Sequence, residues 1–262
     1  MSLPTTLRFH LLLERLVNTV ARKKIVFVIV EGPSDDEALG VLFEKLFDQT
    51  TVFVHITHGD ITSDPGVDPH FIVSNVTNIV KAYAKSNHLT NSHFQQIIHI
   101  VDTDGAFVTN DHIVEDSSAE KPIYSLTEIR TANVHGLQMR NERKKKSLSR
   151  LSRLQAIWNI PYQVYYMSCN LDHVLHNIQN LTDEEKEKKA LAFVKQYRDK
   201  LGAFVQFLSE SEFSVSTNYI ESWEFITHEL HSLERHTNLG LCVKDAFIDK
   251  TEREHSQERQ ES

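Results

Sequence analysis

The sequence predicts an α/β protein with a mainly parallel, four-stranded sheet that is flanked by helices and extended by a helical C-terminal region. Hydrophobic runs of strand length recur at residues 25–30, 52–56, 97–101 and 164–167. Apolar residues at helical spacing follow several of these runs, and this alternation is typical of parallel sheets. After about residue 180 only helical patterns remain. Together these observations predict an open sheet with helices on its faces.

In the first half, a helix is expected at residues 7–20, before the first strand. Residues 25–30 are all β-branched or aromatic, which is typical of a strand buried on both faces. Ser34 with Glu37 three positions later forms a capping box and predicts the start of the next helix. A second strand at 52–56 and a helix at 71–84 follow.

In the second half, the third strand is expected at 97–101, and residues 106–134 show no long periodic pattern and are expected to be irregular. Residues 140–158 are expected to form a loop that leads into a helix. The fourth strand, at 164–167, precedes a short helix that contains Leu171. Thr182 and Glu185 form a second capping box at the start of a helix of about 25 residues, and another helix is expected at 219–233.

We therefore divide the 262 residues into four regions. They are an N-terminal helix (1–24), an α/β core (25–180), a helical extension (181–248) and a charged tail that is expected to be disordered (249–262).

Composition excludes several classes of protein. The net charge of −8 argues against a protein that coats nucleic acid nonspecifically. No apolar run approaches the length of a membrane span, and no membrane partner is expected. Two cysteines, Cys169 and Cys242, in no CxxC pair make a disulfide framework improbable, so a reducing cytoplasm is expected.

Acidic residues follow two of the predicted strands at the point where each strand ends. Glu31 and Asp35 follow the first strand, and Asp102 and Asp104 follow the third. The carboxyl ends of parallel strands meet at one edge of a sheet, where sites form. Carboxylates gathered there repel one another, and their oxygens suit Mg²⁺ or Mn²⁺. Repulsion also predicts that removing one of these charges raises the melting temperature of the metal-free protein.

These residues form two motifs that resemble those of the Toprim domain. The first is V-E-G-x-x-D at residues 30–35, and the second is a hydrophobic residue followed by D-x-D-G, at residues 101–105. The residues of the first motif are most similar to those of the OLD-family branch, which includes Toprim nucleases of phage-defence systems. The pair Leu171-Asp172 is similar to a Leu-Glu pair of that branch, with a shorter acid. The resemblance covers residues 25–180 and implies a Rossmann-like catalytic core.

The resemblance implies a magnesium-dependent endonuclease that cleaves DNA or RNA. Asp102 and Asp104 would hold the ion, Glu31 would act as an acid, a base or a second ligand, Asp35 would complete or position the site, and Asp172 is a further candidate ligand. The ATPase domain of full OLD proteins is absent from this chain, so the resemblance implies a separate ATPase partner. Self-association is left open.

Two other interpretations stay open. The haloacid-dehalogenase phosphatases also carry D-x-D-G after a strand, with the first Asp as nucleophile, here Asp102. Their later G-D-x-x-x-D motif has a counterpart at 59–64, but in the reversed order. We therefore interpret Asp60 and Asp64 as loop acids, with a place at the rim of a metal site as the alternative. The second interpretation is a non-catalytic Toprim scaffold that binds nucleic acid or a partner. For Asp35 by itself, a role as a helix cap is the alternative to a role in the site.

A basic segment at residues 140–153 contains seven basic residues and one acid. Beside a metal site, such a segment is what a phosphate backbone requires. The alternative is an exposed, solvated surface. The predicted nucleic-acid contacts are Arg140, Arg143, Lys144, Lys145, Lys146 and Arg150.

Overall fold

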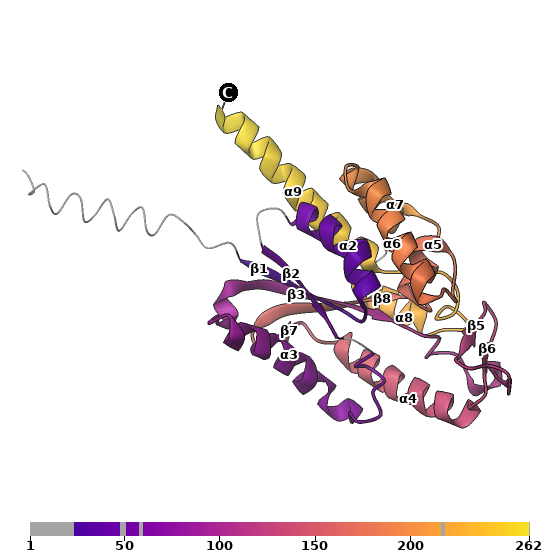
Figure 1. The fold of residues 1–262 in the computed structure, drawn as a ribbon. Helices are drawn as coiled ribbons and strands as arrows, with labels where there is room; N and C mark the ends of the chain where they lie inside the picture. The colour runs from indigo at the N-terminus through magenta and orange to yellow at the C-terminus, as the bar shows by residue number, and fades with distance from the viewer. Residues whose placement is uncertain (1–23, 48–50, 58–59, 216–217, 262) are drawn as a thin grey trace, which may run out of the picture.

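A five-stranded mixed sheet forms the centre of the computed structural model, which describes residues 24–47, 51–57, 60–215 and 218–261 (Figure 1). Its order is β2-β1-β3-β8-β7. The strands are β1 (Ile25–Val30), β2 (Thr51–Ile56), β3 (Phe94–Asp102), β7 (Ala156–Ile157) and β8 (Ile160–Met167). The first three and β8 are parallel, and β7 pairs antiparallel with β8. The α/β class and the mainly parallel sheet are confirmed, but the predicted number of four strands is wrong.

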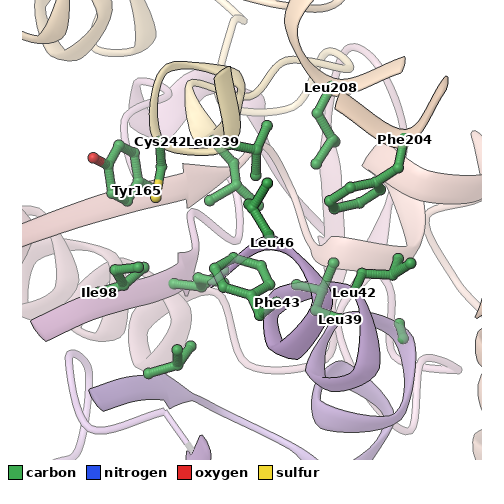
Figure 2. Packing of buried hydrophobic residues seen from close by; sticks show 14 of the residues in the cluster. Leu39, Leu42, Phe43, Leu46, Ile98, Tyr165, Phe204, Leu208, Leu239 and Cys242 are labelled. Carbon is green, nitrogen blue, oxygen red and sulfur yellow. The ribbon is translucent and has the colours of Figure 1, made fainter. Parts of the chain in front are cut away.

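Every residue of β1 is buried, as its continuous apolar run predicts. On one face of the sheet lie α2 (Pro33–Leu46), α6 (Asp183–Tyr197), α7 (Leu201–Glu210) and the first part of α9 (Leu239–Glu261). Figure 2 shows how Phe43, Phe204 and Leu239 of these helices meet Ile98 and Tyr165 of the sheet. The region after residue 180 therefore packs directly on the sheet.

The opposite face is covered by α3 (Ile72–Ser86), by the end of α4 (Val134–Leu151) and by α8 (Tyr219–Ile226). Ile72, Val76 and Val80 of α3 are fully buried there. Between β8 and α6 lies the short helix α5 (Leu171–His176). Among the residues that the structure describes, no helix is long and apolar enough to cross a membrane.

A second, small sheet lies in the segment that was expected to be irregular. It contains β4 (Ile113–Glu115), β5 (Ile123–Tyr124) and β6 (Ile129–Thr131) in the order β4-β6-β5. Single 3₁₀ turns occur at η1 (Pro69–Phe71), η2 (Asn91–His93) and η3 (Asn110–His112). Strands of two or three residues are too short to produce a periodic pattern, which is why the sequence did not predict them.

Several predicted boundaries are wrong. Helix α2 begins after Gly32, two residues before the expected N-cap Ser34, because Pro33 fits the first helical turn. The basic segment expected in a loop lies mostly within α4. The long helix expected from Thr182 is divided into α6 and α7. The helix expected at 219–233 ends at Ile226. Most of the tail that was expected to be disordered is helical and forms the end of α9. The helix expected at 7–20 lies outside the described residues.

Candidate active site

The carboxyl ends of β1, β3 and β8 meet at one edge of the sheet, because these strands are parallel neighbours. Glu31 follows the last residue of β1, and Asp102 is the last residue of β3. The backbone amide of Asp102 donates a hydrogen bond of 3.3 Å to Oε1 of Glu31. The structure thus brings together the acids of the two motifs, as expected.

The turn after β3 aims Asp104 into the same site. Asp104 and Gly105 both adopt positive φ, 48° and 63°. A Cβ atom on Gly105 would lie 2.5 Å from Cδ2 of Leu233, so only glycine fits there. Thr103 anchors the turn, because its hydroxyl donates to the carbonyl of Ser232 and accepts from the amide of Cys169, both at 2.9 Å.

Lys144 of α4 lies in the middle of this group of acids. Its side chain is completely buried. Its amine lies 2.5 Å from Oδ2 of Asp104, 2.7 Å from Oδ2 of Asp60 and 3.7 Å from Oε1 of Glu31. The expectation that Lys144 belongs to an exposed basic run is wrong, since its helix turns this side chain toward the sheet edge.

A second cation of the basic segment also points inward. The guanidinium of Arg140 donates to the backbone carbonyl of Asp104 and to the hydroxyl of Tyr124, both at 2.8 Å, and to Oδ1 of Asn141 at 2.7 Å. With these partners, Arg140 fixes the turn of the second motif. Tyr124, from the small sheet, was not predicted as part of the site, and no sequence signal marks it.

Asp60 lies within the site itself, whereas the sequence suggested a loop acid or a position at the rim of the site. Its carboxylate accepts from the amide of Thr62 at 2.7 Å and from the hydroxyl of Ser63 at 2.5 Å. Burial opposes its charge, but Lys144 and these hydrogen bonds prevail and lower the pKa of Asp60 below its usual range. Asp64 is not brought into the group, and its carboxylate accepts from the amide of Gly66.

Asp35 and Asp172 form an outer group beside the central acids. Oδ2 of Asp35 accepts from the amide of Gly32 at 2.9 Å, which caps α2. Asp172 pairs with Lys186 of α6 at 3.6 Å. Burial raises the pKa of Asp35 to about 6, and the nearby charge of Asp172 adds to this effect. Asp35 therefore both caps the helix and contributes to the field of the site.

The central group carries an excess of negative charge. Four carboxylates, those of Glu31, Asp60, Asp102 and Asp104, face two cations, Lys144 and Arg140, so two negative charges are left over when all are ionised. Burial and neighbouring carboxylates raise the pKa of Glu31 and of Asp102 well above the usual range. Such a group favours either protons or an added cation.

The donor chemistry suits a hard divalent cation, because every candidate ligand is a carboxylate oxygen. In the geometry of the described residues, however, no group of three or more His, Cys, Asp or Glu side chains is arranged as a metal site. The amine of Lys144 lies where it binds three of these carboxylates at once. The acids thus fit the ion by their chemistry, and Lys144 is the cation around which they are arranged.

The other basic residues of α4 lie on its outer side. A cavity of about 700 Å³ is lined by Pro69, His70, Lys145, Lys146, Ser149, Arg150, Arg153 and Leu154. Arg143 is held differently, since its guanidinium donates to the carbonyl of Ser63 at 3.2 Å. The basic segment is therefore divided between an inner face, with Arg140 and Lys144, and an outer face that lines the cavity.

Comparison with known proteins gave no match to this chain, neither among family models nor among curated proteins or solved structures.

Proposed function

We propose that this protein is a divalent-cation-dependent nuclease with a Toprim-like core, which hydrolyses phosphodiester bonds in DNA or RNA. The observation that carries the proposal is the convergence of Glu31, Asp102 and Asp104 at one sheet edge, with an excess of negative charge. Mg²⁺ or Mn²⁺ would be held by these three carboxylates. A bound ion would activate a water molecule and stabilise charge on the attacking and leaving oxygens.

The chain's own residues have distinct roles in this proposal. Glu31, whose pKa is raised by burial, suits a group that takes up or releases a proton in the reaction. Asp102 is oriented by the amide of Leu171 at 2.9 Å. Arg140 holds the backbone carbonyl of Asp104 and so restrains the turn that carries this acid. Asp35 positions the start of α2, and Asp172, paired with Lys186, is the outermost candidate ligand.

The cavity on the outer side of α4 supports a nucleic-acid substrate. It is lined by four basic side chains, Lys145, Lys146, Arg150 and Arg153. Clustered lysine and arginine neutralise phosphates and release counterions, which supplies most of the affinity for a nucleic-acid backbone. Because the residues of the first motif resemble those of OLD-family proteins, we also propose a separate ATPase partner and a role in phage defence.

The test is a cleavage assay on the purified full chain with plasmid, single-stranded DNA and total RNA, in Mg²⁺, in Mn²⁺ or in EDTA. We expect cleavage of at least one substrate with a divalent ion and none in EDTA. Glu31→Gln should be inactive, whereas Glu44→Gln, an exposed acid of α2, should be as active as the parent. Absence of cleavage with both ions and all three substrates would contradict the proposal.

One observation favours a phosphatase as the second candidate. Asp60, from the G-D segment that precedes the D-x-D-G motif in the sequence, binds the same lysine as Asp104. The reversed order of the two motifs along the chain is thus no obstacle to a shared site. Asp102 would then form an aspartyl-phosphate. Hydrolysis of p-nitrophenyl phosphate, or trapping of beryllofluoride on Asp102, would favour this candidate, and we expect neither.

A further inference from the structure

The buried amine of Lys144 is a feature that the proposed hydrolysis does not use. Four separate segments contribute to its surroundings: α4 carries the lysine, and the three carboxylates come from the end of β1, the loop after β2 and the turn after β3. Because the side chain is completely buried, bulk water does not screen its charge, and neighbouring carboxylates must balance it.

Electrostatics keeps this amine charged. The carboxylates of Asp104, Asp60 and Glu31 surround the amine at 2.5, 2.7 and 3.7 Å, and negative charge this close favours the ammonium form. Conversely, the acids depend on the lysine. Without a cation between them, Glu31, Asp60 and Asp104 would repel one another in a poorly solvated site. Lys144 thus does for these acids what a bound divalent ion does for a carboxylate cluster.

We propose that Lys144 is a resident cation, which holds the carboxylates of Glu31, Asp60 and Asp104 together in the metal-free protein and competes with a divalent ion for their oxygens. This inference rests on the proposed divalent-cation site. It explains why a group of acids with hard oxygen ligands has no metal geometry among the described residues. It also means that the ion binds only when the amine leaves its partners, so Lys144 sets the concentration of ion that the site requires.

The experiment compares the full-length parent with Lys144→Met, which removes the charge but keeps an unbranched apolar chain. Two quantities are measured: the melting temperature in EDTA and in Mg²⁺, and the affinity for Mg²⁺ by calorimetry. In EDTA the variant should melt several degrees below the parent. Adding Mg²⁺ should raise the melting temperature of the variant back to that of the parent. Its affinity for Mg²⁺ should be at least about tenfold higher, because one nearby positive charge is gone. Lys146→Met, an exposed lysine of the same helix, should match the parent in both measurements.

Each alternative outcome has a defined meaning. Equal Mg²⁺ affinity of parent and Lys144→Met, with tight binding in both, overturns the resident-cation role and leaves the proposed metal site intact. Absence of Mg²⁺ binding in both overturns the metal site itself. If Lys144→Met does not fold in EDTA, the charge-balanced double variant Lys144→Met/Asp60→Asn serves as the second protein. It should fold and bind Mg²⁺ more tightly than Asp60→Asn alone, and equal binding overturns the proposal.

Discussion

The backbone amide of Leu171 donates a hydrogen bond of 2.9 Å to Oδ1 of Asp102, so the start of α5 holds the acid at the end of β3. An asparagine at position 102 keeps an acceptor oxygen for this amide and removes only the charge. Burial and the neighbouring Glu31 raise the pKa of Asp102, which means that its charge is unfavourable in the folded protein. We expect Asp102→Asn to abolish cleavage and to melt, metal-free, at or above the temperature of the parent.

The measurement is a thermal melt in EDTA together with the cleavage assay. Asp102→Ala is the matched variant, because it removes both the charge and the acceptor for Leu171. It should melt below Asp102→Asn. Undiminished cleavage by Asp102→Asn would exclude this acid from the reaction.

Asp104→Asn should behave in the opposite way. Repulsion among acids alone predicts that this variant is stabilised, but Asp104 provides the shortest ion pair of the buried Lys144. Removing one partner of a buried pair leaves an under-compensated charge, which typically costs about 3 kcal/mol. We therefore expect a lower melting temperature for Asp104→Asn than for Asp102→Asn in EDTA. The reverse order would mean that Asp60 and Glu31 are sufficient partners for the lysine.

The sequence predicted the parallel core strands and the convergence of Glu31, Asp102 and Asp104, because continuous apolar runs and the acids that follow them are local features. It did not predict that Lys144 points inward. A signal was present, since Leu137, Asn141, Lys144 and Leu148 recur at helical spacing and are all buried on one face of α4. A run of lysines is typical of an exposed, charged surface, and it masks the helical periodicity of these buried positions. Tyr124 and the small sheet depend on tertiary pairing and leave no local pattern.

His99 provides a test of pH dependence. It is buried in β3, and its Nδ1 lies 2.8 Å from the hydroxyl of Tyr162. Burial lowers its pKa from about 6.5 to about 3, so the unfolded chain binds this proton more readily than the folded protein. The stabilising contribution of neutral His99 is therefore complete above pH 6.5 and is lost as the pH falls toward 3.

Between these limits the slope for one group is about 1.4 kcal/mol per pH unit. Other groups, such as Asp35 with its raised pKa, increase the stability of the folded protein as the pH falls. The contribution of His99 is therefore measured as a difference between two proteins. The free energy of unfolding of the parent minus that of His99→Gln should fall with this slope as the pH is lowered. A difference that does not vary with pH would show that His99 titrates normally.

Gly105 connects the shape of the second motif to stability. Its φ of 63° is strained for any other residue, and a Cβ atom would overlap side-chain atoms of Leu233 and Ile129 at 2.5 and 2.9 Å. We expect Gly105→Ala to lower the free energy of unfolding by about 2 kcal/mol or more. Gly202→Ala is the control, because its Cβ would meet nothing closer than 3.6 Å and the position lies in α7. It should be neutral or slightly stabilising, and similar losses in both variants would contradict this explanation.

The basic residues of α4 require a revised substitution. Changing Lys144 together with Lys145 and Lys146 would confound binding with stability, because Lys144 is buried among the acids. The set that tests binding is Lys145, Lys146 and Arg150, which line the outer cavity. Lys146 forms a surface pair with Glu142 at 3.3 Å, and exposed pairs of this kind contribute little, so its loss should affect stability little.

In an Asp102→Asn background, which prevents cleavage, the variant with alanine at 145, 146 and 150 should bind nucleic acid more weakly for all sequences alike. Each lost phosphate contact should also reduce the slope of log affinity against log salt by about one unit on duplex DNA.

A general change in net charge would weaken binding too, and the control separates the two effects. Alanine at Lys188, Lys195 and Lys200, which are exposed on α6 and just beyond it, removes the same number of charges from another surface. Since counterions are released only where phosphates are neutralised, this control should keep the parent's slope. Equal affinities and equal slopes for both triple variants would mean that the outer face of α4 is a solvated surface and that nucleic acid approaches the acids from elsewhere.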